Sequence, residues 1–353
     1  MMNSIRHCRS FLFVAITAGI AYLPLHGESA KPTGPWQVKR ELKIGGEGRW
    51  DYVTFDPASK RLYVPRSTHT QVIQTDTGAV VGDLKDTPGV HGVALATDLG
   101  RGFTSNGKGN SVTVFDLKTL EVLGTFPTGQ NPDAIYYDSG SKKVFVFNGK
   151  SKDATVIDAT AAKFDAAAVV ATIPLGGKPE TPVSDNKGRI FVTLEDLNAI
   201  GVINIATLKL SDTWPMPGGD EPSGLAIDRS GGRLFAGCCG NNVMVVIDLQ
   251  TRKVLTTLPI GKGVDGCGFD PATSEAFASC GDGTLTVIKE TKPGTFEVVQ
   301  TASTATGART MTIDPSTHTI YLPTADNGPA AAGQKRPNPL PGTFKIIVVE
   351  RAG

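Results

Sequence analysis

The sequence predicts an all-β protein that repeats one structural unit seven times. Seven short segments begin with an aromatic residue, and they follow one another at intervals of roughly 40 to 46 residues. Their first residues are Tyr63, Phe103, Phe145, Phe191, Phe235, Phe277 and Tyr321. Gly and Pro, with 41 and 23 copies, fall at regular intervals and mark turns in an all-β chain. Because four short strands make a repeat of this length, we predict a seven-bladed β-propeller of four-stranded antiparallel blades.

The fifth repeat shows the expected order of elements within one blade. Its predicted strands are residues 223–228, 233–238, 243–248 and 254–260, with turns rich in Gly, Asn and Ser between them. Apolar runs of this length, bounded by turn residues, are typical of strands that are buried on both faces. Each blade of a propeller lies between two neighbours, so burial on both faces is expected.

The two ends of the chain predict how the ring closes. The seventh repeat contains three predicted strands, at residues 310–314, 319–324 and 344–351, and its fourth strand is missing. Residues 36–44 precede the first repeat and resemble the outer strand at residues 254–260. We predict that this N-terminal strand completes the last blade, because the pairing would remove two exposed sheet edges.

The first thirty residues have the pattern of a secretory signal peptide. Arg6 and Arg9 precede an apolar run at residues 11–25, which small and polar residues follow. This order is typical of signal peptides, and the run is short for a membrane-spanning helix. We therefore assign residues 1–30 to a signal peptide and residues 31–353 to the propeller domain. We expect a periplasmic or secreted protein with no membrane span after cleavage.

The charges of the chain nearly cancel, with 35 Lys and Arg residues against 34 Asp and Glu residues. Removal of residues 1–30 leaves 33 of each. A nearly neutral chain lacks the basic field that drives binding to nucleic acids, so we do not expect a nucleic-acid partner. We expect a monomer.

The aromatic segments resemble the tetrapeptide that names the YVTN-type seven-bladed propeller family. The two nearest segments are Phe103-Thr104-Ser105-Asn106 and Phe145-Val146-Phe147-Asn148. The resemblance covers essentially the whole mature chain and implies the propeller fold and an exported bacterial protein. The repeats are also similar, more distantly, to the haem-carrying propellers of nitrite reductases and to lactonase propellers. Function does not follow from this fold, because propellers include binding proteins, scaffolds and several classes of enzyme.

Alignment of the seven repeats on their aromatic residue reveals a column of polar side chains where each first strand begins. The column contains Asp51, His91, Asp133, Glu180, Ser223, Asp265 and Arg309. A second column, two residues earlier, contains Arg49, Gly89, Asn131, Lys178, Glu221, Gly263 and Gly307. Glu221 supplies an acid to the blade whose first-column residue is Ser223. Because the innermost strand of each blade begins at the rim of the central channel, we expect these side chains to converge on one mouth.

Carboxylates, one imidazole and one guanidinium around one opening favour a ligand or cation site. Oxygen-rich rings with an imidazole suit hard or borderline metal ions. Repulsion among the carboxylates raises some of their pKa values, which would allow one acid to act as a general base. The alternative is that these acids only accept hydrogen bonds from the exposed N–H groups of the strand ends.

Four cysteines follow the predicted signal peptide: Cys238, Cys239, Cys267 and Cys280. Clustered cysteines in an oxidising compartment usually pair, so disulfides across neighbouring blades are the first interpretation. Three complete pairings are possible, and the sequence does not select among them. Free buried thiols are the second interpretation. A copper or zinc thiolate site is the third, because no CxxC motif or nearby His supplies the usual ligands.

Two functions fit these features. The first is an exported binding protein or scaffold that presents an acidic channel mouth to a small ligand, a cation or a protein partner. The second is a metal-dependent hydrolase that resembles lactonase propellers, with a divalent cation held by Glu180, Glu221 and Asp265, or by some of these together with Asp133. That cation would polarise a carbonyl group and activate a water molecule.

An insertion at residues 328–342, which contains Lys335 and Arg336, is either a partial lid or a tolerated surface loop.

Export makes a direct prediction about the mature chain. When the full sequence is produced in a Gram-negative host, we expect the periplasmic protein to begin near residue 31, because the signal peptide is removed on export. N-terminal sequencing and intact-mass measurement of the periplasmic fraction check this expectation. A chain that keeps Met1 and stays in the cytoplasmic fraction would contradict it.

Overall fold

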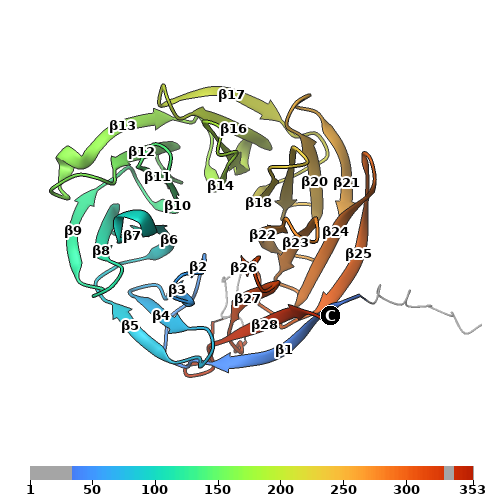
Figure 1. Ribbon diagram of the computed structural model, residues 1–353, viewed down its shortest axis with the longest axis horizontal. Coiled ribbons are helices and arrows are strands. Elements are labelled where there is room, and N and C mark those ends of the chain that lie inside the picture. The colour runs from blue at the N-terminus through green and yellow to red at the C-terminus, as the bar shows by residue number, and fades with distance from the viewer. Residues whose placement is uncertain (1–33, 330–337, 353) are drawn as a thin grey trace, which may run out of the picture. The chain divides into compact units, whose positions relative to one another are not determined.

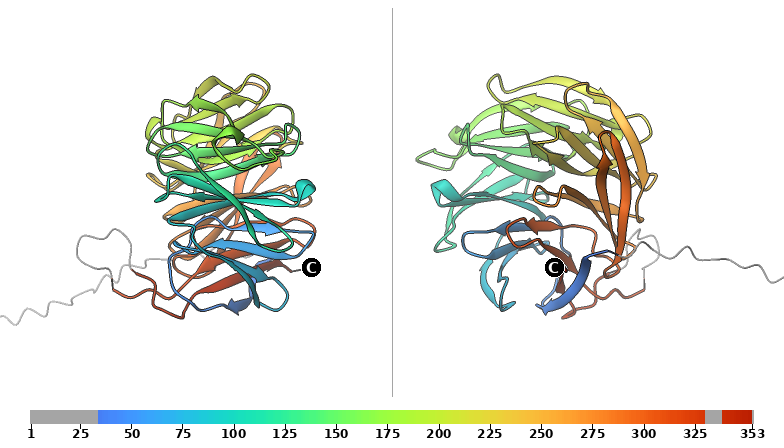
Figure 2. Two further views of the ribbon diagram at one scale, coloured as in Figure 1. Left: turned by 90° about the vertical axis from the view of Figure 1, so that its left-hand side faces the viewer. Right: turned by 45° about the vertical axis from the view of Figure 1, so that its right-hand side comes forward.

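The computed structural model describes residues 34–329 and 338–352, which belong to one compact unit. These residues form seven four-stranded antiparallel sheets that follow one another around a ring (Figure 1). The first strand of each sheet lies nearest the central axis and the fourth lies at the rim. Figure 2 shows the same sheets from the side, stacked around the ring. The seven-bladed propeller predicted from the repeats is therefore confirmed.

Six blades are built from consecutive strands, which run in order from the inner strand to the outer one. They are β2–β5 (Thr54–Asp56, Arg61–Pro65, Thr70–Gln74, Val80–Leu84), β6–β9 (Val90–Ala96, Arg101–Asn106, Ser111–Asp116, Val122–Pro127), β10–β13 (Pro132–Asp138, Lys143–Asn148, Asp153–Asp158, Val169–Pro174), β14–β17 (Pro179–Ser184, Arg189–Leu194, Ala199–Asn204, Lys209–Pro215), β18–β21 (Pro222–Asp228, Arg233–Cys238, Val243–Asp248, Val254–Pro259) and β22–β25 (Val264–Asp270, Glu275–Cys280, Thr284–Lys292, Thr295–Ser303). Short 3₁₀ helices lie in three of the connections, at η1 (Thr97–Leu99), η2 (Ala166–Ala168) and η3 (Glu195–Leu197). No helix among the described residues is long and apolar enough to cross a bilayer.

The seventh blade joins the two ends of the described chain. It contains β26 (Thr312–Asp314), β27 (Thr319–Thr324), β28 (Lys345–Arg351) and, as its outer strand, β1 (Trp36–Lys43). β1 and β28 are antiparallel, with Trp36 opposite Arg351. The closure predicted from the sequence is therefore present, with an outer strand one residue shorter than expected.

Trp36 anchors the closing strand to the sixth blade. Its indole is fully buried and lies edge-on to the Phe277 ring, at a centroid distance of 4.7 Å. Its Nε1 donates a hydrogen bond of 2.9 Å to Oε2 of Glu275. β1 thus completes one blade by backbone pairing. Trp36 joins it to the sixth blade through its indole and through two backbone hydrogen bonds with the Gln300 side chain.

The repeated aromatic residue of each blade is a core residue. All seven are buried in the second strands of their blades, and several contact a ring of the neighbouring blade. The ring centroids of Tyr63 and Phe115 lie 5.9 Å apart, and those of Tyr321 and Phe55 lie 5.5 Å apart. Ring pairs at these distances add stability beyond the area they bury. The repeat signature is therefore an inter-blade packing signal.

In three blades, a side-chain hydroxyl group on the second strand connects to the start of the inner strand of the next blade. Oγ1 of Thr193 donates to the carbonyl oxygen of Ser223 (3.1 Å), and Oγ of Ser279 donates to that of Ala308 (2.6 Å). Ser105 makes the same bond to the carbonyl oxygen of Asp133. These bonds position the start of one inner strand relative to the blade before it.

The fifth blade lacks this hydroxyl, and a cysteine packs in its place. A Cβ atom on Gly237 would lie 2.7 Å from Sγ of Cys267, so only glycine leaves room for the sulfur. All four cysteines are free thiols in the structure; Cys238 and Cys280 are buried, whereas Cys239 and Cys267 are half-buried. Burial raises the pKa of Cys238 and of Cys280 to about 12, so neither forms a thiolate readily near neutral pH.

Ring closure predicts a large effect of one substitution. We expect Trp36→Ala to lower the free energy of unfolding by about 3–5 kcal/mol, because it removes a buried indole and leaves a cavity. Val38→Ala, on the same strand but at an exposed position, should change it by less than about 0.5 kcal/mol. Urea unfolding of both variants measures the difference. Equal midpoints for Trp36→Ala and the unsubstituted protein would show that β1 does not support the fold.

Candidate functional site

The turn before each inner strand sets where the first-column side chains begin. Second-column residues in five blades adopt left-handed backbone conformations: Gly89 (φ +67°), Asn131 (+55°), Glu221 (+49°), Gly263 (+69°) and Gly307 (+85°). In four of these blades the carbonyl oxygen of that residue accepts a hydrogen bond from the residue after the second strand. This shared geometry explains why Gly and Asn are frequent in the column.

The Glu221 side chain contacts Cys239, and no hydrogen bond or ion pair among the described residues joins it to a first-column side chain. Its backbone is part of this turn, and its side chain is exposed. Its carboxylate lies 3.8 Å from the Sγ atom of Cys239, which also lies 3.3 Å from the Glu221 carbonyl oxygen. The left-handed turn therefore directs this side chain differently from what an alignment of the repeats implies.

Five first-column side chains form one connected polar network. Nδ1 of His91 lies 2.6 Å from Oδ2 of Asp51 and 3.6 Å from Oδ1 of Asp133. Nε of Arg309 donates to Oδ2 of Asp265 (2.5 Å), and its Nη2 lies 3.8 Å from Oδ1 of Asp51. We call these five residues the mouth network. In order of contact they are Asp133, His91, Asp51, Arg309 and Asp265, from blades three, two, one, seven and six.

Glu180, from the fourth blade, is held separately. Nζ of Lys178 lies 2.6 Å from its Oε1 and also contacts Glu195. The hydroxyl of Tyr52 donates to Oε2 of Glu180 at 3.4 Å. Ser223 supplements the network by donating to Oδ1 of Asp265 at 2.8 Å.

Tyr52 and Lys178 are the residues whose roles the sequence did not predict. Tyr52 comes directly after Asp51 and immediately before the first blade, yet its hydroxyl contacts the fourth blade. In the sequence, the position of Tyr52 beside a first-column acid was the one sign that it could belong to the site. An aromatic residue at the start of a strand is more often a core residue, so this sign did not predict the contact. Lys178 was visible in the second column, without an assigned partner.

The network holds protons near neutral pH. Burial lowers the pKa of His91, but the Asp51 hydrogen bond and nearby carboxylates outweigh it and raise that pKa to about 9. Burial raises the pKa of Asp133 to about 7 against the effect of His91. Burial and the charge of Asp133 raise the pKa of Glu180 to about 9, although Lys178 opposes them. The raised pKa values favour the imidazolium form of His91 and the protonated form of Glu180 near neutral pH.

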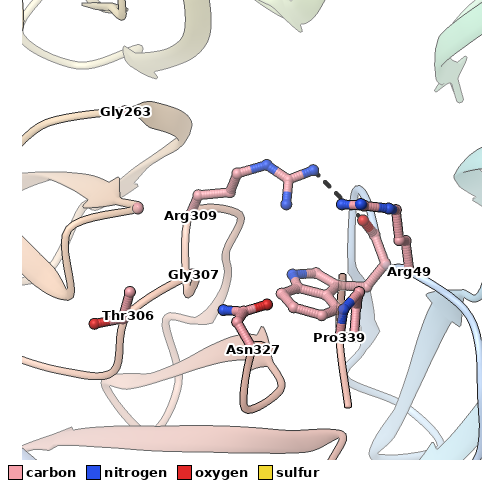
Figure 3. Close-up of a pocket in the computed structure, with 9 residues that line it drawn as sticks. Arg49, Gly263, Thr306, Gly307, Arg309, Asn327 and Pro339 are labelled. Atoms are coloured by element: carbon pink, nitrogen blue, oxygen red, sulfur yellow. Dashed lines mark hydrogen bonds between the residues drawn. The ribbon is translucent and has the colours of Figure 1, made fainter. Parts of the chain in front are cut away.

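A cavity of about 220 Å³ adjoins the network where blades six and seven approach the loop before the first blade (Figure 3). Its lining residues are Arg49, Trp50, Gly263, Gly281, Thr306, Gly307, Arg309, Asn327 and Pro339. Figure 3 shows the guanidinium ends of Arg309 and Arg49 pointing toward one another. Nε1 of Trp50 is buried and has no hydrogen-bond partner among the described residues. An unsatisfied buried donor of this kind costs about 1–3 kcal/mol.

Arg66 fixes the loop that carries Arg49 and Trp50. Its side chain is buried against the Phe344 ring, with the guanidinium carbon 3.7 Å from the ring centroid. Its nitrogens donate to the carbonyl oxygens of three loop residues: Gly45 (3.2 Å), Glu47 (2.9 Å) and Gly48 (3.2 Å). A buried side chain therefore holds this part of the cavity wall, in addition to the exposed hydrogen bonds that Arg49 makes with Ser67 and Asn338.

The trio expected to bind a metal ion is not brought together. Glu180, Glu221 and Asp265 each have different partners, and they do not lie within metal-ligand distance of one another. In the described part of the chain, the group of three ligand atoms within 4.8 Å of one another comes from Asp51, His91 and Asp133. Lys335 and Arg336 of the expected lid lie outside the described residues.

Comparison with known proteins supports the fold of this chain and does not identify its family or its function. No protein-family model matches this sequence, and a search of curated proteins finds no match. The chain is similar to one chain of a solved structure titled "Crystal Structure of Mitotic Checkpoint Complex". The two are 13% identical with a TM-score of 0.73, over 98% of this chain and 99% of that chain. At this identity the likeness supports a seven-bladed propeller, and the YVTN resemblance stays a prediction.

The raised pKa of Glu180 predicts how stability depends on pH. Between the usual Glu pKa of about 4.3 and the folded value of about 9, the folded protein keeps a proton that the unfolded chain has lost. The free energy of unfolding therefore falls as pH rises through this range. Glu180→Gln mimics the protonated acid. Its free energy of unfolding should exceed that of the unsubstituted protein by about 1–3 kcal/mol at pH 8, and the two should be equal near pH 4.

Urea unfolding at pH 4, 6 and 8 measures this difference. Glu297→Gln removes one exposed carboxylate from an outer strand and serves as the matched control. Identical pH dependence for Glu180→Gln and the unsubstituted protein would refute the assignment of a protonated Glu180.

Proposed function

We propose that this chain is an exported binding propeller that takes its ligand at the channel mouth, with a divalent cation as the first occupant to test. The observation that supports this proposal is the convergence of Asp51, His91 and Asp133 from three successive blades. One ligand atom from each lies within 4.8 Å of the others. Two carboxylates and one imidazole are ligands for borderline divalent ions.

Once Asp133 and Glu180 lose their protons, the charge balance at the mouth also favours a cation. Five carboxyl groups belong to the network and its neighbours, in Asp51, Asp133, Glu180, Glu195 and Asp265, against three bases, in His91, Lys178 and Arg309. Burial raises the pKa of Asp133 and of Glu180, so a cation at this mouth competes with protons. A cation that replaced the His91 proton would keep a positive charge beside Asp51 and Asp133.

The hydrolase alternative has weaker support. Its proposed ligands Glu180, Glu221 and Asp265 are dispersed among separate partners. An acid that is protonated at pH 7 does not act as a general base there, which removes Glu180 from that role. The binding function requires neither a metal held by these three residues nor a general base.

The location and the partners of the protein follow from the sequence and remain proposals. The signal-peptide pattern at residues 1–30 supports export to the periplasm or beyond. A rigid propeller face also suits a protein partner or a small molecule. The nearly neutral charge argues against a nucleic acid as the ligand, and the protein is proposed to act as a monomer.

Manganese binding tests the cation site. Titration of the mature chain with Mn²⁺, followed by the loss of the free-ion EPR signal, should reveal one site per chain. Metal binding displaces the proton of His91, whose pKa is about 9, and that of Asp133, whose pKa is about 7. Affinity for Mn²⁺ should therefore rise by more than about tenfold from pH 7 to pH 8.

Asp133→Asn should weaken this binding by about tenfold or more, because it removes an anionic ligand. His318→Gln is the matched control: Nδ1 of His318 lies 2.6 Å from Oδ2 of Asp270, so this pair repeats the His91–Asp51 contact elsewhere in the ring. An unsubstituted chain that leaves the Mn²⁺ signal unchanged, or an Asp133→Asn variant with full affinity, would overturn the proposed cation site.

A further inference from the structure

The cavity beside the mouth network presents hydrogen-bond donors that the described chain does not satisfy. Trp50 is 6% exposed and lines the cavity, and its indole N–H has no acceptor among the described residues. An indole nitrogen only donates, so no rearrangement of its own proton resolves the deficit. The group that satisfies it has to bring an acceptor.

Arg309 adds further donors to the same wall. Its Nε is held by Asp265 and its Nη2 by the Trp50 carbonyl oxygen at 3.5 Å, which orients the guanidinium beside the cavity (Figure 3). No described residue accepts a hydrogen bond from its Nη1. Arg49 also lines the cavity, with its Nη2 donating to Oδ1 of Asn338 at 2.7 Å. A guanidinium has no acceptor atom, so both arginines select ligands that accept.

Glycines keep the opposite wall free of side chains. Gly263 and Gly307 line the cavity with φ values of +69° and +85°, which other residues rarely adopt. A Cβ atom on Gly307 would lie 3.3 Å from Nδ2 of Asn327 and 3.7 Å from Cζ2 of Trp50, so it would occupy the space beside the indole. The same turn that begins the inner strand therefore leaves room for a ligand.

We propose that this cavity binds the carboxylate group of a small molecule with a planar or apolar body. The carboxylate would accept from the Trp50 indole N–H and from the Arg309 guanidinium, while Arg49 adds positive charge at the opening. Charge-assisted bonds to a planar guanidinium are among the strongest hydrogen bonds in proteins. A volume of about 220 Å³ is below the range of pockets for drug-sized ligands, so we expect a ligand of about the size of one ring with its head group. The inference shares with the proposed function only the location at the channel mouth, since it uses different residues.

Three probes with one ring and different head groups test this inference: benzoate, benzamide and benzylamine. The chain has three tryptophans, so ¹⁵N-labelled indole groups of the mature protein give three signals, and Trp50→Phe assigns one of them. Benzoate should move the Trp50 signal and bind about tenfold more tightly than benzamide, because a carboxylate makes charge-assisted bonds. Benzylamine should not move it.

Two variants check the contacts by calorimetry. Trp50→Phe and Arg49→Gln should each weaken benzoate binding by about tenfold, and Arg49 is exposed, so its substitution leaves the core intact. Trp214→Phe is the control, because that indole donates to Asp212 on an outer strand. Thermal unfolding of each variant verifies that the fold is retained.

The outcomes separate this inference from the cation site. A preference for benzylamine, equal binding of all three probes, or no movement of the Trp50 signal would overturn the carboxylate site. If Mn²⁺ still binds in that case, the proposed function stands without the inference. If neither Mn²⁺ nor benzoate binds, both are wrong.

Discussion

The burial of each blade between two neighbours is the constraint on which the rest of this structure depends. A single four-stranded blade exposes two apolar faces, and the ring covers both faces of all seven. The ring has to close for this to hold, and β1 closes it by pairing with β28 while Trp36 packs on Phe277. Without that closure, the faces of the last blade and its edges would be open to solvent.

Closure also explains how charged side chains are kept close together at the mouth. The inner strands cannot separate without breaking inter-blade packing and the hydroxyl bonds between neighbouring blades. Carboxylates that would repel one another in a flexible chain are therefore held near His91, Arg309 and Lys178. Burial, followed by the charge of neighbouring carboxylates, raises the pKa of Asp133 and of Glu180, so both acids keep a proton more readily than exposed acids do.

Asp51 links the two proposed sites. It contacts His91 on one side and Arg309 on the other, and it belongs to the first blade, next to the closure. A cation on Asp51 would weaken its attraction to Arg309 and so strengthen the field that Arg309 presents to the cavity. The two ligands would then favour one another, because a coupling between two sites is reciprocal.

The repeat by itself determined the propeller, the number of blades and the role of β1, because periodic burial and turn residues are local properties of the chain. Predicted strands such as Arg233–Cys238 and Val243–Asp248 match the structure to the residue. The first column was also readable, since each inner strand starts at an equivalent point. Only the tertiary structure decided which of these side chains meet: Tyr52 contacts Glu180 in the fourth blade, while Glu221 is exposed beside Cys239. Such contacts depend on the diameter of the ring and on the direction of each side chain, and neither property is repeated in the sequence.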